Sequence, residues 1–331
     1  MNILHLNRFF YSGQTGYVFS LVGEQQRLGV NARLVMDGSP SYKALSVYKE
    51  TIRELDVDVT SSGHVNTLLK RTREFAPQLI HAHSSLTFPL AAYLAKELKI
   101  PYVVTCHGLG LNRQEYKPYL QQARAILCIS PRVAKTLHRY AEKITIVPNG
   151  LDLEDYPLKE KNDPIKVALI SRVEAGRQKG YDHFCKAVDI LEGVKFFVAS
   201  NVVPKSKTAE YLGWPDNTSE LLTDTDILAA SGRFAMEGLA AGNALLILGR
   251  TFQGLLTPET TAKQPIPDLS GLTGSDPCYK TIFYDLAKLT QNQIYLRQLQ
   301  QFCRELAEKE FCNKKLAKRT LTIYKNILHQ R

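Results

Sequence analysis

Short apolar runs alternate with longer amphipathic stretches along nearly the whole chain, and this alternation constrains the fold more than any other feature. The pattern predicts parallel sheets, because parallel neighbours must be joined by long crossover connections that are usually helices. The expected strands of the first half are 2–6, 32–36, 79–82, 102–106, 125–129 and 144–147. Those of the second half are 165–170, 194–199, 226–229 and 244–248.

The length of 331 residues suggests two domains, each with its own core, at ~150 residues per domain. Pro148, Asn149 and Gly150 interrupt the alternation, and the polar, proline-bearing stretch that follows has the composition of a linker. We therefore expect an α/β protein with two doubly wound, Rossmann-like domains. The expected parts are a first domain 1–150, a linker 151–164, a second domain 165–310 and a helical C-terminal segment 311–331.

Lysine and arginine total 42 against 32 acidic residues, a net charge of +10 that favours polyanionic partners. The cations are scattered, so we expect no nucleic-acid partner. The clusters 70–73 and 314–319 are either solvated helix faces or a peripheral contact with the anionic inner face of a membrane. The six cysteines form no C-x-x-C pair and no signal peptide is evident, which predicts a reducing, cytoplasmic location.

Ligands of parallel α/β sheets bind beyond the carboxyl ends of the strands, so the loops after the expected strands are the candidate sites. The first loop contains Gly13 and Gly16, which would let backbone N–H groups approach a phosphate or sugar, or would only join strand to helix. His107 follows the strand 102–106. It could hydrogen-bond to a sugar hydroxyl, or it could cap its own loop.

The second half contains two candidate loops. Arg172 and Lys179 precede a helix, where a guanidinium fork, an ammonium and helix N–H groups suit a diphosphate, although a solvated basic loop is the alternative. Gly232 and Arg233 open a later helix that contains Glu237. A buried carboxylate needs a partner, which is either a pair of ligand hydroxyls or a neighbouring arginine.

Two patterns suggest a metal, and we adopt neither. His81 and His83 form a pair without an evident third ligand. The triplet Asp224-Thr225-Asp226 matches the D-x-D pattern of metal-dependent sugar transferases, but such triplets often arise by chance. We therefore expect no metal and no cofactor.

Together these segments resemble glycosyltransferase family 4, a group of retaining enzymes with the GT-B fold, and the resemblance runs over nearly the whole chain. The segments that carry it are 81–84, 105–108, 129–133, 147–152, 171–180 and 236–242. The resemblance implies two domains facing across a cleft, with a C-terminal helix that crosses back to the first domain.

The resemblance also implies roles for individual residues. Arg172 and Lys179 would hold the donor diphosphate, Glu237 would bind the ribose hydroxyls, and His107 would contact the donor sugar. The donor would also be contacted by Gly13, Gly16, Gly232 and Arg233, and the acceptor by Gln14, Thr15 and His83. The reaction would be metal-independent hexosyl transfer with retention, from a UDP-sugar in preference to a GDP-sugar, to a glycan, lipid-linked or small-molecule acceptor.

The sequence departs from the family at the first of two glutamates, because Ala229 stands eight positions before Glu237. The turn at Gly232 and Arg233 would replace that glutamate, or donor binding is altered. A non-catalytic relative that binds sugar nucleotides or glycans is therefore the main alternative. An epimerase of nucleotide sugars is a third hypothesis, for which the sequence offers no convincing pair of acid and base carboxylates.

Overall fold

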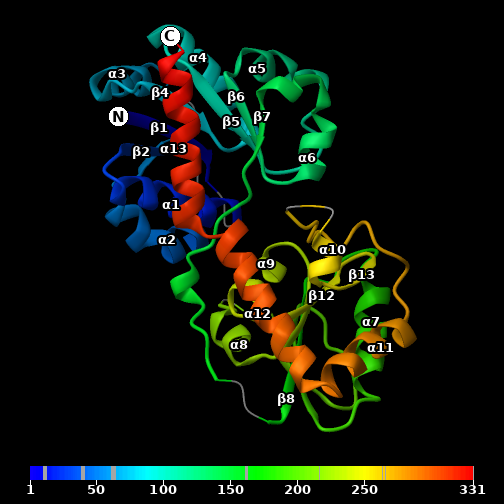
Figure 1. The fold of residues 1–331 in the computed structure, drawn as a ribbon. Coiled ribbons are helices and arrows are strands. Elements are labelled where there is room, and N and C mark those ends of the chain that lie inside the picture. Colours follow the sequence, from blue (N-terminus) through cyan, green and yellow to red (C-terminus); the bar gives the residue numbers. More distant parts are fainter. Residues whose placement is uncertain are drawn as a thin grey trace. The chain divides into compact units, whose positions relative to one another are not determined.

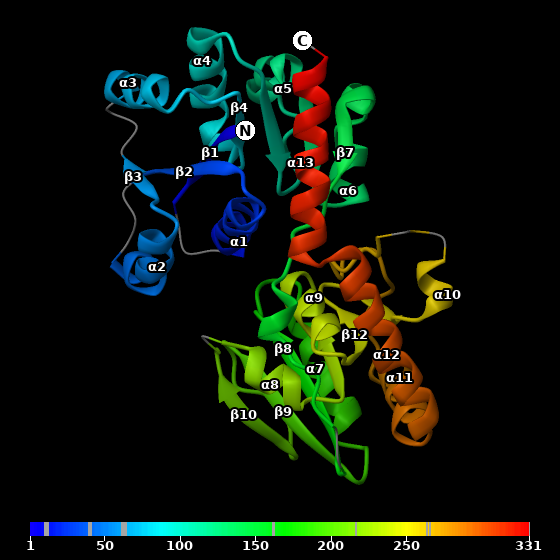
Figure 2. The same cartoon turned by 60° about the vertical axis from the view of Figure 1, so that its left-hand side comes forward.

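The computed structural model describes residues 1–9, 13–38, 42–60, 65–160, 163–215, 217–262, 264 and 266–330. Residues 11 and 12 of the first glycine loop and 161 and 162 of the expected linker lie outside the described residues. The chain divides into two compact units, Met1–Gly150 with Asn313–Arg331, and Leu151–Cys312 (Figures 1 and 2).

The first unit contains a seven-stranded parallel sheet. Its strands, in order across the sheet, are β3 (Asp58–Thr60), β2 (Asn31–Asp37), β1 (Asn2–Arg8), β4 (Leu79–Ala82), β5 (Tyr102–Cys106), β6 (Ala125–Cys128) and β7 (Ile144–Ile146). Neighbouring residues of a strand point to opposite faces, so both faces of the sheet are apolar and both must be covered.

Helices cover both faces of this sheet. Leu4, Ile80 and Val104 pack on one side, and their neighbours Ile3, Leu79 and Val103 pack on the other. The first side is covered by α3 (Val65–Phe75), α4 (Phe88–Leu98), α5 (Lys117–Gln122) and α6 (Pro131–Thr136). The elements packed on the other side include α1 (Gly13–Arg27), α2 (Tyr42–Glu54) and the C-terminal helix α13 (Asn313–His329).

The C-terminal helix α13 is part of the first unit although it follows the second unit in sequence. Its residues Leu321, Tyr324 and Ile327 are buried against β1, β4, β5 and β6. At its start, the side chain of Asn313 donates a hydrogen bond of 2.9 Å to the carbonyl of Ser20 in α1. Figure 1 shows α13, in red, lying along the first unit beside α1.

The second unit contains a six-stranded sheet. Its strands, in order, are β10 (Ala209–Gly213), β9 (Val194–Ser200), β8 (Ile165–Ser171), β11 (Ile227–Ala230), β12 (Ala244–Leu248) and β13 (Phe252–Leu255). Its helices are α7 (Gln178–Val188), α8 (Ser219–Asp224), α9 (Arg233–Ala240), α10 (Pro258–Thr261), α11 (Tyr279–Thr290) and α12 (Gln293–Glu310). One core joins α7, α11 and α12 to the sheet.

Three short strands were not predicted, namely β3, β10 and β13. The predicted strands are parallel, as expected, whereas β13 pairs antiparallel with β12 at the edge of the second sheet. These three strands lie at sheet edges and contain few buried residues, so they lack the continuous apolar run that marks the central strands.

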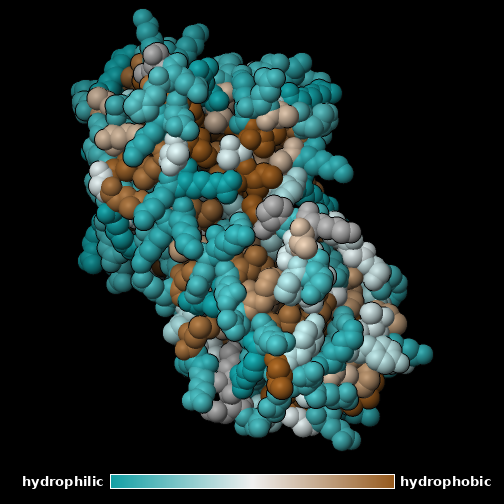
Figure 3. Space-filling model, in the orientation of Figure 1, coloured by the Kyte–Doolittle hydropathy of each residue, from teal (hydrophilic) through white to brown (hydrophobic). Residues whose placement is uncertain are grey.

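None of the described helices is long and apolar enough to cross a membrane. In the view of Figure 3, hydrophilic residues make up most of the visible face.

The loop around Gly271 lies directly against the carboxyl end of β12, and we expect this contact to limit substitution. A Cβ on Gly249 would lie 2.6 Å from the carbonyl oxygen of Gly271, which belongs to the backbone and cannot rotate away. Gly249→Ala should therefore destabilise the second unit by about 1–3 kcal/mol. Urea unfolding followed by the fluorescence of Trp214, the single tryptophan, measures this.

Gly23→Ala is the matched control. Gly23 lies inside α1, and a Cβ there would make only an ordinary contact of 3.5 Å, with Leu55. This substitution should leave the stability of the first unit unchanged or raise it by up to about 1 kcal/mol, as measured by urea unfolding followed by circular dichroism. Equal unfolding midpoints for the Gly249→Ala variant and the native chain would show that the loop is not tightly packed.

Candidate functional site

Each unit has one point where the strand order reverses, between β1 and β4 in the first unit and between β8 and β11 in the second. The connections that leave the two strands there run to opposite sides of the sheet, which leaves a crevice beyond their carboxyl ends. Most of the predicted site residues lie in or next to the loops at these two points.

Gln14 bridges the reversal point of the first unit. It lies in the first turn of α1, and its side-chain nitrogen donates hydrogen bonds to Oδ1 of Asn7 at 2.8 Å and to the carbonyl of His83 at 3.0 Å. Because Asn7 belongs to β1 and His83 follows β4, one amide ties together the ends of the two diverging strands.

A cavity of about 290 Å³ opens at this point. It is lined by Gln14, His83, Ser84, Ser85, Leu86, Thr105, His107, Gly108, Leu109 and Leu111. The structure therefore brings together three predicted residues, Gln14, His83 and His107. Thr15 is fully buried and does not line the cavity, whereas Gly16 has open space where a side chain would be.

A cluster of buried histidines lies beneath this cavity. Nδ1 of His5 is 3.0 Å from Nε2 of His83, and Nε2 of His5 is 2.9 Å from Oε1 of Gln25. Nε2 of His81 is 2.6 Å from the hydroxyl oxygen of Thr105, and its Nδ1 contacts the hydroxyl of Tyr324.

Burial keeps these imidazoles neutral. It lowers the pKa of His5 to about 4, although a hydrogen bond to Gln25 opposes the shift. It lowers the pKa of His107 to about 3, with Asn149 opposing. The pKa values of His81 and His83 fall well below the ordinary range, first through burial and then through the neighbouring histidines. All four are therefore neutral hydrogen-bonding groups near pH 7.

The expectation that the histidine pair lacks a third ligand was wrong. One nitrogen from each of His5, His81 and His83 lies within 4.8 Å of the others, so three possible metal ligands meet here. His5 is adjacent to His81 because β1 and β4 pair in register at these two positions. Both nitrogens of His5 and of His81 also have hydrogen-bond partners among the described residues.

Arg177 bridges the reversal point of the second unit. It lies in the loop after β8, and its guanidinium donates a hydrogen bond of 3.3 Å to the hydroxyl of Ser231, which follows β11. The next residue, Gly232, has φ of 63° and donates to the carbonyl of Leu269 at 2.6 Å. Its backbone conformation favours glycine, which explains the glycine at the start of α9.

Glu237 has protein partners in the structure. Its Oε1 accepts a hydrogen bond of 2.7 Å from Nε of Arg233 one turn earlier in α9, and its Oε2 accepts one of 2.7 Å from the hydroxyl of Thr218. The carboxylate is buried, whereas the arginine is half-exposed. The structure thus contains the arginine ion pair that the sequence left open as the alternative to ligand hydroxyls.

The other predicted cations are exposed and lie near acidic residues. Nε of Arg172 lies 3.4 Å from Glu174, with 69% of the arginine side chain exposed, and Lys179 contacts Asp276. Exposed pairs of this kind are weak, so an anionic ligand can compete for both cations. Sequence reasoning passed over Arg177, whose only signal was its place in the same basic loop. It also missed Arg250, which packs beside Gly176 of that loop.

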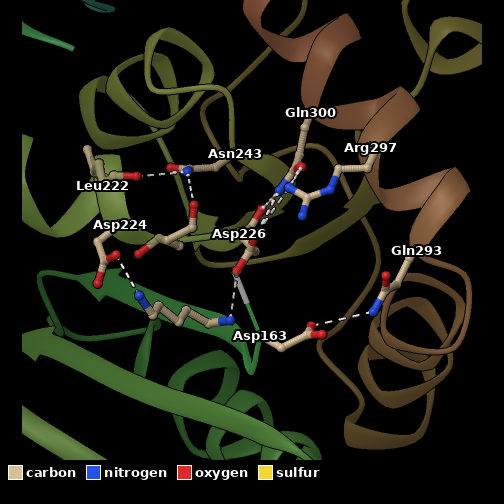
Figure 4. Close-up of polar contacts among 10 residues, drawn as sticks. Asp163, Leu222, Asp224, Asp226, Asn243, Gln293, Arg297 and Gln300 are labelled. Atoms are coloured by element: carbon tan, nitrogen blue, oxygen red, sulfur yellow. Dashed lines mark hydrogen bonds and ion pairs between the residues drawn. The ribbon is translucent and has the colours of Figure 1, made fainter. Parts of the chain in front are cut away.

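The acidic triplet 224–226 lies beside the amino ends of β8 and β11, away from the carboxyl ends where the other predicted residues lie (Figure 4). Asp226 is buried, and its carboxylate accepts hydrogen bonds from the amide of Lys166 at 2.9 Å and from Gln300 at 3.1 Å. Asp224 pairs with the ammonium of Lys166. These partners give the carboxylates a structural role at the amino ends of β8 and β11.

The second unit also has a cavity of about 620 Å³ beside β13, lined in part by Gln253, Asp268 and Asp285. None of the predicted site residues lines it.

Comparison with known proteins adds independent evidence. A model described as Glycosyltransferase Family 4 matches residues 11–155. The uncharacterized glycosyltransferase YqgM of Bacillus subtilis (strain 168) is 28% identical over 168 residues, which cover 46% of this chain and 45% of YqgM. The chain therefore spans less than half the length of this curated relative.

Solved structures resemble the chain over its whole length. Anabaena HepE in complex with UDP matches with a TM-score of 0.73 and 13% identity, covering 98% of this chain and 100% of HepE. The UDP-GlcNAc 2-epimerase of Neisseria meningitidis matches with a TM-score of 0.67 and 11% identity, covering 100% of both chains. The chain has the GT-B fold. This confirms the expected α/β class with two Rossmann-like domains, and both sequence matches relate the chain to glycosyltransferases.

The buried histidines make the first unit sensitive to acid. A histidine whose pKa is lowered by folding contributes stability that is complete above its unfolded value, about 6.5, and is lost as the pH falls toward the folded value. Between about pH 7 and pH 5.5 each of the four buried histidines should lower the free energy of unfolding of the first unit by about 1 kcal/mol, which is about 4–5 kcal/mol in all.

Hydrogen exchange measured at both pH values resolves the two units. The second unit is the internal control, because its single histidine is His183. Equal losses of protection in the two units would show that the buried cluster is not the cause.

Proposed function

We propose that this protein transfers a sugar from a nucleotide-diphosphate sugar to an acceptor, without a metal and with retention of configuration. The observation that carries the proposal is the arrangement at the reversal point of the second unit. The helices α7 and α9 both begin there, and neither is capped by the side chain of its N-cap residue, Arg177 or Gly232. Uncapped helix N–H groups beside Arg177, Lys179 and Arg233 suit a diphosphate.

The chemistry fits these groups. Breaking the bond from sugar to diphosphate builds negative charge on the leaving group and positive charge on the sugar. Cations and helix N–H groups beside the leaving group stabilise the developing diphosphate charge, and so lower the barrier. Arg172, Arg177 and Lys179 would act on the diphosphate, and His107 would contact the donor sugar.

Glu237 would bind the ribose hydroxyls with the lone pairs that Arg233 and Thr218 leave free, since a carboxylate can accept about four hydrogen bonds. We favour UDP as the nucleotide because the structurally similar HepE was solved in complex with UDP.

We place the acceptor at the first-unit cavity. Its lining combines polar groups with Leu86 and Leu109, which are 61% and 50% exposed. Exposed leucines beside a polar cavity favour an acceptor that carries an apolar group next to its hydroxyls, as a lipid-linked acceptor does.

A non-catalytic binder of sugar nucleotides is the second candidate. It is favoured by Ala229, which is fully buried in β11 and offers no carboxylate, and by the occupied state of Glu237. An epimerase finds less support, because no carboxylate is present among the described residues that line the first-unit cavity.

UDP should raise the melting temperature of the protein, since a ligand that binds only the folded state stabilises it. Arg177→Ala and Lys179→Ala should each weaken UDP binding about tenfold or more, as expected for the loss of a charge-assisted hydrogen bond. Lys195→Ala is the matched control, because Lys195 is exposed in β9 near the amino edge of the same sheet. Equal weakening by all three variants would point to net charge and not to a site.

Slow release of free sugar from a UDP-sugar, unchanged by a chelator, separates an enzyme from a binder. Release that Arg177→Ala abolishes supports transfer. Tight UDP binding without release from any common UDP-sugar, with or without added glycoside acceptors, would favour the non-catalytic candidate.

A further inference from the structure

Two hydrogen-bonded chains run from the interior of the first unit to its cavity. The first leads from Gln25 through His5 to His83. The second leads from Tyr324 through His81 to Thr105. His83 and Thr105 line the cavity, whereas the other members of both chains are fully buried beneath it.

Gln25 sets the direction of the first chain. The amide oxygen of Gln25 can only accept, so Nε2 of His5 must carry the proton. A neutral imidazole has a single N–H group, so Nδ1 of His5 is an acceptor and Nε2 of His83 must donate to it at 3.0 Å. Nδ1 of His83 is then left with its lone pair, and it has no hydrogen-bond partner among the described residues.

The second chain can be directed in the same way. The hydroxyl of Tyr324 is able to donate as well as to accept. The phenol can then donate to Nδ1 of His81, whose Nε2 donates to the hydroxyl oxygen of Thr105. Thr105 accepts this bond and keeps its own proton for another acceptor.

The two chains therefore end in complementary groups. His83 then carries an acceptor and Thr105 a donor, and both residues line the cavity. The neighbouring aromatic groups, His107 and Tyr17, lie 6.1 Å and 6.2 Å from His83 between ring centroids and are also uncharged near neutral pH. The described lining includes no charged side chain, which excludes a salt bridge as the means of recognition.

We propose that this cavity binds a hydroxyl group of a neutral polyol, with Nδ1 of His83 and the hydroxyl of Thr105 as contact atoms and Gln25, His5 and His81 as positioning residues. The inference rests on the proposed function in one respect, that the polyol is the sugar acceptor.

The tautomer of His83 can be read directly from nitrogen chemical shifts of the full chain labelled with ¹⁵N-histidine, without a ligand. We expect His5 and His83 to be neutral at pH 7, each protonated at Nε2 alone. The loss of signals in the variants below assigns His83. A proton on Nδ1 of His83 would overturn the proposal.

Gln25→Leu should remove the group that fixes the chain, so His83 should become a mixture of tautomers. Gln26→Leu is the matched control, because Gln26 is the next residue of the same helix and donates to the carbonyl of Ala32 instead. A single unchanged tautomer in Gln25→Leu would show that Gln25 is not a positioning residue.

Two variants of His83 test the contact itself. Asparagine places an oxygen near the position of Nδ1, whereas glutamine places its terminal group near Nε2. With methyl glycosides of glucose, galactose, mannose and N-acetylglucosamine as probes, His83→Asn should bind at least one probe as the native chain does. His83→Gln should bind that probe about tenfold more weakly. Equal affinities, or no binding of any probe to the native chain at millimolar concentration, would overturn the proposal.

The two proposals can fail separately. UDP binding depends on residues of the second unit, so His83→Gln should retain the UDP-induced rise in melting temperature. A native chain that binds a glycoside but not UDP would refute the proposed transferase alone. A chain that binds UDP but has Nδ1 of His83 protonated would refute the hydroxyl site alone.

Discussion

The reversal of strand order within each sheet is the constraint on which both candidate sites depend. A parallel strand must be followed by a crossover on one face, and at β1 with β4 and at β8 with β11 adjacent strands send their chains to opposite faces. The two carboxyl ends are therefore left uncovered by their own connections. In each unit one long polar side chain spans this opening, Gln14 in the first and Arg177 in the second.

A comparison of the amino and carboxyl ends of the strands in the second sheet shows how position decides the role of a buried carboxylate. At the amino ends, the carboxylate of Asp226 accepts hydrogen bonds from the amide of Lys166 and from Gln300, and the guanidinium of Arg297 lies 3.9 Å away (Figure 4). All of these partners belong to the protein and hold the sheet and α12 together. At the carboxyl ends, the carboxylate of Glu237 forms an ion pair with Arg233, a half-exposed side chain that can turn toward a ligand. A sequence motif such as D-x-D does not show at which end of the strands its carboxylates will lie, because that depends on how the unit folds.

The central strands could be predicted because each is buried on both faces and reads as a continuous apolar run. The edge strands β3 and β10 could not, since none of their residues is fully buried and they carry no such run. The edge strand β7 was predicted, because its sequence is Ile-Thr-Ile. The candidate loops follow the carboxyl ends of strands, as the sequence predicted. Which residue of a basic loop reaches across to the next strand was not predictable, as Arg177 shows. The third histidine of the cluster was missed because β1 brings His5 beside His81 only through strand pairing.

The histidine cluster is costly unless something binds above it. A buried acceptor without a partner costs about 1–3 kcal/mol, and Nδ1 of His83 is such an atom among the described residues. Hydrophobic packing alone would be served better by an apolar side chain at this position, as at Leu4 and Ile80 in the neighbouring layer of the same strands. The arrangement of Gln25, His5 and His83 is instead directed. His83 donates to His5 and His5 donates to Gln25, which leaves a lone pair on Nδ1 of His83, a residue that lines the cavity. A ligand hydroxyl would supply the missing bond and offset that cost.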